Sequence, residues 1–167
     1  ALFVAALTGS AWASAAMPED EDVLEDYNRG VFAFNEDLDR VLLKPLAEGY
    51  KAILPDLVMT GISNFFSNLN DVVVLANNVL QCDFPQAAQT SSRLVFNTSF
   101  GILGLFDVAT RMELPKTYAD FGQTLGRWGV GEGYFMVLPL LGPTTMRDGV
   151  GLIGDFFINP ITWGTDS

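Results

Sequence analysis

The sequence predicts an all-α fold, a single domain of amphipathic helices interrupted by one glycine-rich hairpin loop. The chain has 167 residues, which is the length of one domain. Apolar residues recur every three or four positions between residues 24 and 53, which is the spacing of one helical face. Three uncharged runs, 57–70, 94–106 and 133–146, fall short of the roughly 20 apolar residues that a helix needs to span a bilayer.

The first residues have the pattern of a secretory signal peptide. Residues 1–18 carry no charge, and Ala13-Ser14-Ala15 matches an A-x-A cleavage site. We therefore expect a signal peptide at 1–15 whose basic n-region is missing, an acidic linker at 16–23 and one folded domain at 24–167. The alternative is a transmembrane anchor, against which the small residues and the acidic cluster that follows both argue.

The first predicted helix covers residues 24–53. Pro45 cannot donate a backbone hydrogen bond, so this helix should kink or divide near Leu43. Pro55-Asp56 then ends it, and Asp56 is expected to cap the next helix. The apolar positions that define its face are Leu24, Tyr27, Val31, Phe34, Leu38, Leu46, Tyr50 and Ile53.

The uncharged run 57–70 predicts a second helix. Asp71 is expected to cap or start a further helix that continues through Leu80. Another helix is predicted from about Pro85 to Thr98. Its buried face is expected to carry the apolar residues Ala87, Ala88, Leu94 and Val95.

Residues 120–149 are the most informative part of the chain. Glycines at 122, 126, 129, 131 and 133 allow the backbone to adopt positive φ. The apolar segment Tyr134–Leu141 follows and is closed by Gly142-Pro143. Thr144-Thr145 then starts a helix, with Arg147 and Asp148 in its first turns.

Two interpretations of these glycines remain, a mobile hinge and an ordinary tight turn. A phosphate-binding glycine loop follows a strand and opens a helix, so that the phosphate meets the helix N-terminus. Here the glycines precede an extended apolar run, and no P-loop lysine follows. Nucleotide binding is therefore not expected.

The composition excludes most catalytic and metal chemistry. The chain has no histidine and one cysteine, so it cannot build a Ser-His-Asp triad, a Cys-His pair or a histidine-based zinc site. Cys82, a lone small hydrophobe, is expected to be structural. The net charge of −11 disfavours nucleic acid and anionic headgroups. We predict no catalytic residue, cofactor, metal or nucleic-acid partner, and hence a protein that is not an enzyme.

The uncharged runs allow two arrangements. The chain has 13 phenylalanines and a mean hydropathy of +0.27, which is apolar for its size. In the first arrangement the helices bury their apolar faces against one another. In the second, some helices lie flat in one membrane leaflet, with the apolar face among acyl chains and the polar face lining an aqueous space.

The run LPLLGPTTMRDGVG at 138–151, with the glycines before it, resembles the MlaA/VacJ family of bacterial outer-membrane phospholipid-transport proteins. Tyr27-Asn28-Arg29, Phe32-Ala33-Phe34-Asn35 and residues 61–69 extend the resemblance over about 24–163. It implies membrane-interfacial helices that form a ring in the inner leaflet of a Gram-negative outer membrane, at its periplasmic face. The implied function is retrograde phospholipid transport from the outer leaflet to a periplasmic carrier. The alternative is a soluble periplasmic α-helical binding or scaffold module.

The resemblance also implies candidate residues for a lipid channel and its gating. They are Phe121 at the start of the glycine-rich loop, Gly129, Gly131 and Gly133 within it, and Phe34 and Asn35 on the first helix. For Phe34 the alternative is an ordinary core phenylalanine at helical spacing. The implied partners are phospholipid, a trimeric porin and a soluble periplasmic lipid carrier.

The chain departs from the family pattern at the signal junction. Family members usually carry a lipidated cysteine there, whereas Cys82 lies far inside this chain. The resemblance also implies further C-terminal sequence beyond Ser167. The mode of anchoring, the porin and the preferred lipid headgroup are left open by the sequence.

Overall fold

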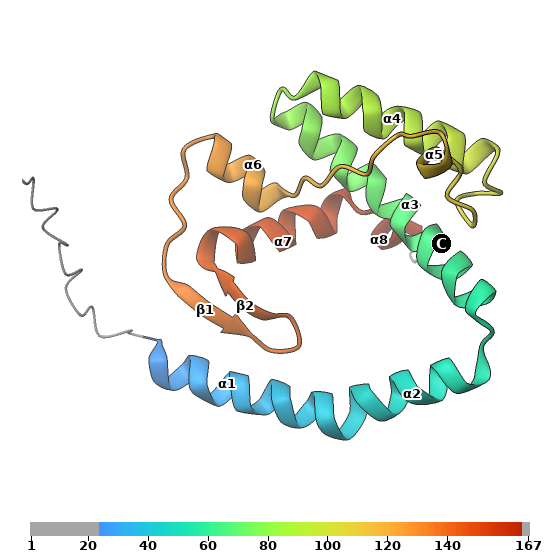
Figure 1. The fold of residues 1–167 in the computed structure, drawn as a ribbon. Coiled ribbons are helices and arrows are strands. Elements are labelled where there is room, and N and C mark those ends of the chain that lie inside the picture. The colour runs from blue at the N-terminus through green and yellow to red at the C-terminus, as the bar shows by residue number, and fades with distance from the viewer. Residues whose placement is uncertain (1–23, 165–167) are drawn as a thin grey trace, which may run out of the picture.

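The computed structural model describes residues 24–164 and arranges them as a ring (Figure 1). The predicted signal peptide and acidic linker lie outside the described residues. The elements are α1 (Glu25–Leu38), the π-helical turn η1 (Asp39–Leu43), α2 (Lys44–Ile53), α3 (Asp56–Leu80), α4 (Phe84–Ser99), α5 (Val108–Arg111), α6 (Phe121–Arg127), β1 (Phe135–Leu138), β2 (Gly142–Thr145), α7 (Met146–Ile158) and α8 (Pro160–Gly164). The predicted helical fold is confirmed, with one two-stranded antiparallel hairpin added.

The helices α1 and α2 form a long arc along one side of the ring (Figure 1). The predicted break near Leu43 is confirmed, and it takes the form of the π-helical turn η1. The Lys44 amide donates to the Asp39 carbonyl, five residues back, immediately before Pro45, which has no amide proton to donate. The proline therefore lengthens one turn of the arc without ending it.

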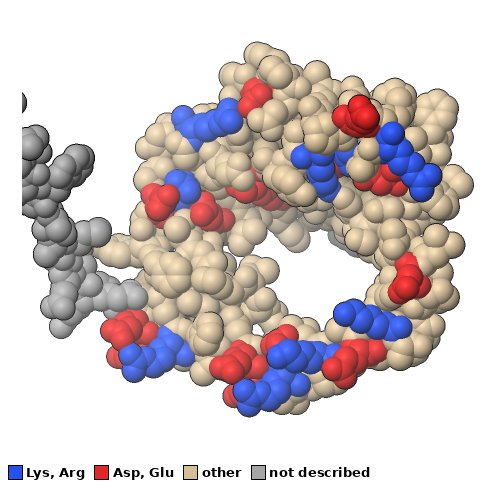
Figure 2. Space-filling view, viewed as in Figure 1, with Lys and Arg blue, Asp and Glu red and all other residues tan. Residues whose placement is uncertain are grey.

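Helix α3 continues from the arc, and α4 packs back against it (Figure 1). The chain then crosses to α6, the hairpin and α7, and the hairpin returns to α1. The register pairs Phe135 with Thr145 and Leu138 with Gly142. Figure 2 shows that this path leaves an opening through the molecule.

Two predictions about helix starts are wrong. Asp56 is the first residue of α3 and makes no capping hydrogen bond; the preceding Pro55 occupies the N-cap position. Asp71 neither caps nor starts a helix, because α3 runs unbroken through it to Leu80. Asp71 is buried inside the bundle, where ion pairs with Arg93 and Lys116 hold its carboxylate.

The predicted inward face of α4 is also largely wrong. Ala87 is buried, but Ala88 and Val95 are exposed and Leu94 is only partly covered. The fully buried side chains of α4 besides Ala87 are the polar Thr90, Arg93 and Asn97. The polar face of this helix thus packs against α3, and its apolar residues point outward.

The same inversion holds for the whole core of the described residues. The buried apolar side chains are all small: Val73, Val74, Ala87, Ala109, Ala119 and Val137. The largest fully buried side chains are instead Arg93, Asn77, Asn78, Thr90, Thr124 and Asp71. Polar pairing between helices therefore takes the place that large apolar side chains hold in a water-soluble core.

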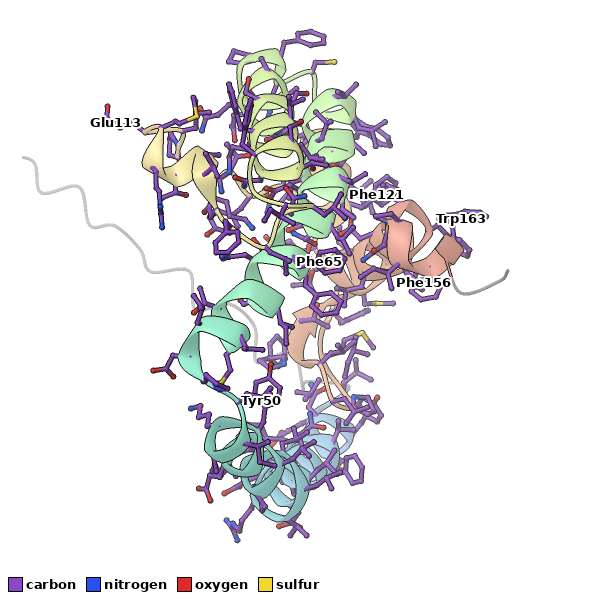
Figure 3. The ribbon with its side chains drawn as sticks, turned by 90° about the vertical axis from the view of Figure 1, so that its right-hand side faces the viewer. Tyr50, Phe65, Glu113, Phe121, Phe156 and Trp163 are labelled. Atoms are coloured by element: carbon purple, nitrogen blue, oxygen red, sulfur yellow. The ribbon has the colours of Figure 1, made fainter. Side chains whose placement is uncertain are left out.

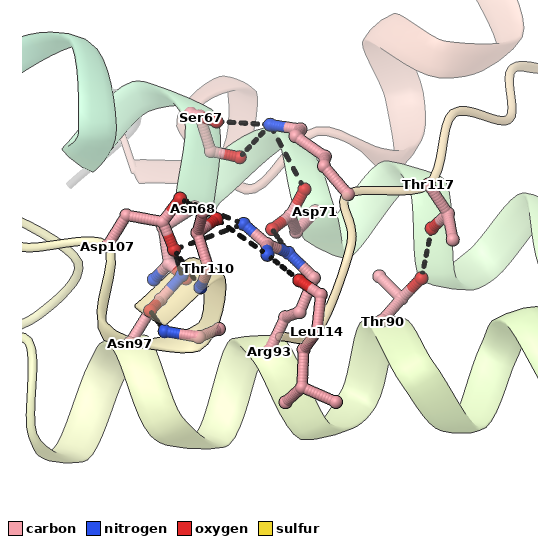
Figure 4. A network of polar contacts seen from close by, with 12 residues as sticks. Ser67, Asn68, Asp71, Thr90, Arg93, Asn97, Asp107, Thr110, Leu114 and Thr117 are labelled. Atoms are coloured by element: carbon pink, nitrogen blue, oxygen red, sulfur yellow. Dashed lines mark hydrogen bonds and ion pairs between the residues drawn. The ribbon is translucent and has the colours of Figure 1, made fainter. Parts of the chain in front are cut away.

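A cluster of charges joins α3, α4 and the chain after α5 (Figure 4). The Arg93 guanidinium lies 3.8 Å from the Asp71 carboxylate and 3.2 Å from that of Asp107. Its Nη1 also donates to the Leu114 carbonyl. Lys116 lies 3.3 Å from the other Asp71 oxygen and donates to Ser67.

The two carboxylates of this cluster respond differently to their surroundings. Burial raises the pKa of Asp71, and the nearby Lys116 and Arg93 offset only part of that effect. Burial also opposes the ionisation of Asp107, but hydrogen bonds from Thr110 and Asn97 and the charge of Arg93 outweigh it, so the pKa of Asp107 lies below its ordinary value. Arg93 is the cation that both carboxylates share.

Replacing Arg93 by methionine should therefore destabilise the fold strongly. The substitution leaves two carboxylates close together around a vacated buried site, and breaking a buried ion pair in this way costs about 3–5 kcal/mol. The unfolding midpoint in mild detergent, followed by circular dichroism, should fall accordingly. Arg111→Met removes an exposed guanidinium from the neighbouring short helix and serves as the control. An equal loss in both variants would contradict a special role for Arg93.

Candidate functional site

Large apolar side chains are exposed on most elements of the ring. The exposed set includes Phe32, Val41, Leu46 and Ile53 on the arc, Leu57 and Phe66 on α3, Phe100, Ile102 and Leu103 after α4, and Ile153, Phe156 and Phe157 on α7. Burying one such side chain is worth about 1.5–3 kcal/mol relative to exposing it to water. Exposed apolar side chains in such numbers are typical of a surface that contacts a membrane or another protein.

The opening is bounded by the α1–α2 arc on one side and by α3, α7 and the hairpin on the others (Figures 1 and 2). Charged side chains gather along the arc, whereas the hairpin segment 134–146 carries no charge. Figure 3 shows Tyr50 on the side of α2 that faces the rest of the ring. The arc thus brings charged side chains to the border of the opening, whereas the hairpin brings none.

Two asparagines of α1 hold the free edge of β1 and so close the ring. Asn28 donates to the Phe135 carbonyl at 3.3 Å and accepts from the Val137 amide at 2.7 Å. Asn35 repeats this two helical turns later, donating to the Leu138 carbonyl at 3.0 Å and accepting from the Leu140 amide at 2.8 Å. Each side-chain amide takes the place of a backbone group on an adjacent strand.

Of the two candidates on α1, Asn35 therefore has a defined contact with the hairpin. Its neighbour Phe34 is 54% exposed, so the alternative of a core phenylalanine is wrong. The role of Asn28 was missed from the sequence. The signal was present, because two asparagines spaced seven residues apart lie on the helical face that also carries the apolar Val31 and Leu38.

The glycine-rich segment differs in part from the expected loop. Gly122 and Gly126 lie within α6, so the loop is confined to the residues between Arg127 and β1. There Gly129 has φ +92° and Gly133 has φ +70°, whereas Gly131 does not adopt positive φ. The hairpin itself is formed by β1 and β2, so the uncharged run 133–146 is not helical until Met146, where α7 begins.

Phe121 begins α6 and lies at the contact between α6 and α7. Its amide donates to both carboxylate oxygens of Asp155 at 3.1 Å. Its ring lies so close to Gly154 that a Cβ there would be 2.4 Å from it. The predicted helix after Thr144-Thr145 is confirmed as α7, whose Thr145 side chain accepts from the Asp148 amide.

Asp155 links three helices. Asn77 of α3 donates to it at 2.7 Å, and Thr124 of α6 donates to the Asn77 side chain at 2.8 Å. Burial raises the pKa of Asp155, the hydrogen bonds from Phe121 and Asn77 oppose that rise, and the negative charge of Asp120 adds to it. This carboxylate was not among the residues that sequence reasoning singled out.

The structure does not bring all the predicted residues into one site. Asn35 meets the tip of the hairpin, Gly129–Gly133 lead into its other end, and Phe121 belongs to the α6–α7 contact. The three groups are joined through the hairpin and α7.

Two further findings bear on what this arrangement can do. Within residues 24–164 no helix combines the length and the apolarity that crossing a bilayer requires. The same residues contain no cluster of acidic or cysteine side chains arranged to hold a metal ion.

Comparison with known proteins identifies similar chains. A family model described as MlaA lipoprotein matches residues 20–167. A Rickettsia felis protein is 40% identical over 145 residues, which cover 86% of this chain and 58% of that protein. The Escherichia coli K12 protein named intermembrane phospholipid transport system lipoprotein MlaA is 35% identical, over 99% of this chain and 67% of its own length. The chain thus spans little more than half the length of the first of these relatives.

A solved structure also matches the fold. It comes from work on the structural basis for maintenance of bacterial outer membrane lipid asymmetry. It has a TM-score of 0.76 and 35% identity, and the match covers 87% of this chain and 75% of that one.

The asparagine contacts with β1 predict site-specific hydrogen exchange. Asn35→Ala removes the acceptor of the Leu140 amide, and Asn28→Ala removes that of the Val137 amide. Each loss of about 1 kcal/mol should speed exchange of its own amide about fivefold and leave the other largely unchanged. Asp37→Ala, an exposed change on the same helix, is the control. Uniform acceleration along the hairpin in every variant would rule out two separate contacts.

Proposed function

The chain belongs to the MlaA lipoprotein family, and on that premise we propose that it carries phospholipid from the outer leaflet of the outer membrane toward a soluble periplasmic carrier. Such retrograde transport would maintain the lipid asymmetry of that membrane. The name of the Escherichia coli relative and the subject of the matching solved structure support the proposal.

The observation that carries the proposal is the inverted polarity of the fold. Its fully buried large side chains are polar or charged, while phenylalanines, leucines and isoleucines cover its surface. Acyl chains solvate such a surface without cost, whereas water does not. The described helices are not suited to crossing a bilayer, so the proposed arrangement has them lying in one leaflet around the opening.

The opening supplies the second half of the argument. A phospholipid headgroup cannot cross hydrocarbon cheaply, because its charges would lose their water without gaining partners. The opening has charged groups along the arc and an uncharged hairpin on another border (Figure 2). It therefore offers a hydrated path for the headgroup next to an apolar path for the acyl chains.

The proposal places the ring in the inner leaflet of the outer membrane, at its periplasmic face. A trimeric porin would hold it there, and a soluble lipid carrier would receive the phospholipid. The candidate gating residues are Phe34, Asn35, Phe121, Gly129, Gly131 and Gly133. The Asn35 contact with the hairpin supports a role in its position, and the positive φ of Gly129 supports a bend at the entry to the hairpin.

The alternative is a soluble periplasmic helical module without a lipid path. The exposed apolar surface argues against it, since water would have to cover phenylalanines on α1, α3 and α7 at once.

A lipid-transfer assay tests the proposal directly. The full-length natural protein, reconstituted into donor vesicles, is expected to move labelled phospholipid to a periplasmic carrier, and copurified phospholipid should be visible by mass spectrometry. The protein should also partition into detergent after removal of its signal peptide. A protein that remains in the aqueous phase, free of lipid and without transfer activity, would favour the soluble module.

Gly129 and Gly131 form a matched pair for the hinge hypothesis. A Cβ at either position meets nothing within 4 Å, but only Gly129 has a left-handed backbone, where a side chain costs about 1–2 kcal/mol. Gly129→Val should therefore slow transfer and raise the surface phospholipid of cells, while Gly131→Val, which requires no left-handed backbone, should change both less. If both stably folded variants transfer lipid normally, the segment is a passive turn.

A further inference from the structure

Two grooves of opposite character meet along α7. The first, of about 640 Å³, lies between the hairpin and α7 and is lined by apolar residues that include Met136, Leu138, Ile153 and Phe157. The second, of about 430 Å³, lies between α6, β2 and α7 and contains charged side chains. Leu141 and Leu152 belong to the walls of both, so the two grooves adjoin at these leucines around one side of α7, and together they are called the trough. Each is within the size range of ligand sites.

The polar groove contains three carboxylates and one guanidinium. Asp120, Asp148 and Asp155 line it together with Arg147. The contact of α6 with α7 brings two of the carboxylates together, because a Cβ on Gly122 would lie 2.7 Å from an Asp148 oxygen and 3.2 Å from an Asp120 oxygen. The groove therefore carries excess negative charge in a confined space.

Arg147, the cationic residue of the polar groove, already pairs with acidic side chains at one end of that groove. The Arg147 Nε donates to Asp148 at 3.0 Å, and its Nη2 lies 3.7 Å from Glu132. Among the described residues, neither Asp120 nor Asp155 forms an ion pair with a lysine or arginine, although both accept hydrogen bonds from backbone amides. Burial is the main cause of the raised pKa of Asp155, and the negative charge of Asp120 adds to it. A cation beside Asp120 and Asp155 would offset it.

We propose that the trough binds one phospholipid with a cationic amine in a zwitterionic headgroup, such as ethanolamine. The amine lies toward Asp120 and Asp155, the phosphate toward Arg147, and one acyl chain occupies the apolar groove. This inference rests on the proposed function and adds the headgroup class to it. An anionic headgroup without an amine, such as glycerol, would bring a further negative charge to three carboxylates and is disfavoured.

Metal binding does not account for these carboxylates, because they are not arranged as a ligand set in the described residues. The apolar groove also ends directly at the polar one across Leu152, which a metal site would not require. Charge and shape together therefore match an amphiphile.

Competition between headgroups tests the inference. The full-length protein is reconstituted into donor vesicles with equal amounts of ethanolamine and glycerol phospholipids, and the lipids that reach the acceptor are quantified by mass spectrometry. The wild-type protein should enrich the ethanolamine lipid about three- to fivefold, as expected for one partly exposed ion pair. Asp155→Asn and Asp120→Asn should each bring the transferred ratio close to that of the donor.

Two further variants separate the parts of the trough. Glu113→Gln also removes one negative charge, but Glu113 lies on the opposite side of the molecule from Phe156 of α7 in Figure 3 and lines neither groove, so this variant should leave the headgroup ratio unchanged. Gly149→Leu places a side chain in the apolar groove, toward Met136 and Leu138, and should lower transfer of both lipids equally.

The outcomes distinguish this inference from the proposed function. Active transfer without ethanolamine enrichment, or enrichment that survives both aspartate substitutions in folded protein, overturns the inference and leaves the proposed function standing. Normal transfer by folded Gly149→Leu overturns the position assigned to the acyl chain. If the wild-type protein transfers neither lipid, the proposed function itself fails.

Discussion

The ring depends on polar pairing along one face of α3. Asn68 donates to Thr98 of α4, and Asn78 donates to Thr90 of the same helix. Asn77 reaches Asp155 of α7 and accepts from Thr124 of α6. A buried polar group that loses its partner costs more than a typical hydrogen bond contributes, so these pairings are specific and obligatory. Helix α3 can therefore gather three other helices without a large apolar core.

This constraint decides what the outside of the molecule is made of. When polar side chains fill the interior, the apolar ones that give the chain its positive mean hydropathy face outward. The same asymmetry permits an opening, since a ring held by specific polar contacts does not need to collapse upon itself to bury apolar area. The asparagines of α1 complete the ring by the same means, with side-chain amides on the edge of a strand.

The regular parts of this fold could be predicted from the sequence because they follow local rules. Helical periodicity predicted the α1–α2 arc, Pro45 predicted its interruption, and Thr145 predicted the start of α7. The inward face of α4 could not be predicted in this way. The rule that apolar residues point inward assumes water outside, and Val95 at 60% exposure violates it.

The candidate site could be predicted only in part, for a related reason. Asn35 and the loop glycines follow from the family resemblance, whereas Asn28 and Asp155 act through partners 109 and 34 residues away in the sequence. A buried Asp71 in mid-helix likewise gives no local signal, because its partners lie on α4 and after α5. Interactions of this kind become visible only when the elements are assembled.

The π-helical turn η1 has a consequence for the geometry of the arc. Such a turn holds one residue more than an α-helical turn, and each residue of an α-helix advances the helix by about 100°. The phase of α2 relative to α1 is therefore set by a single extra residue just before Pro45. Deleting one amino acid from this turn would restore regular α-helical winding and rotate the Tyr50 side of α2 by about a quarter of a revolution. One wall of the opening would then present different side chains, while the asparagine contacts of α1 stayed in place.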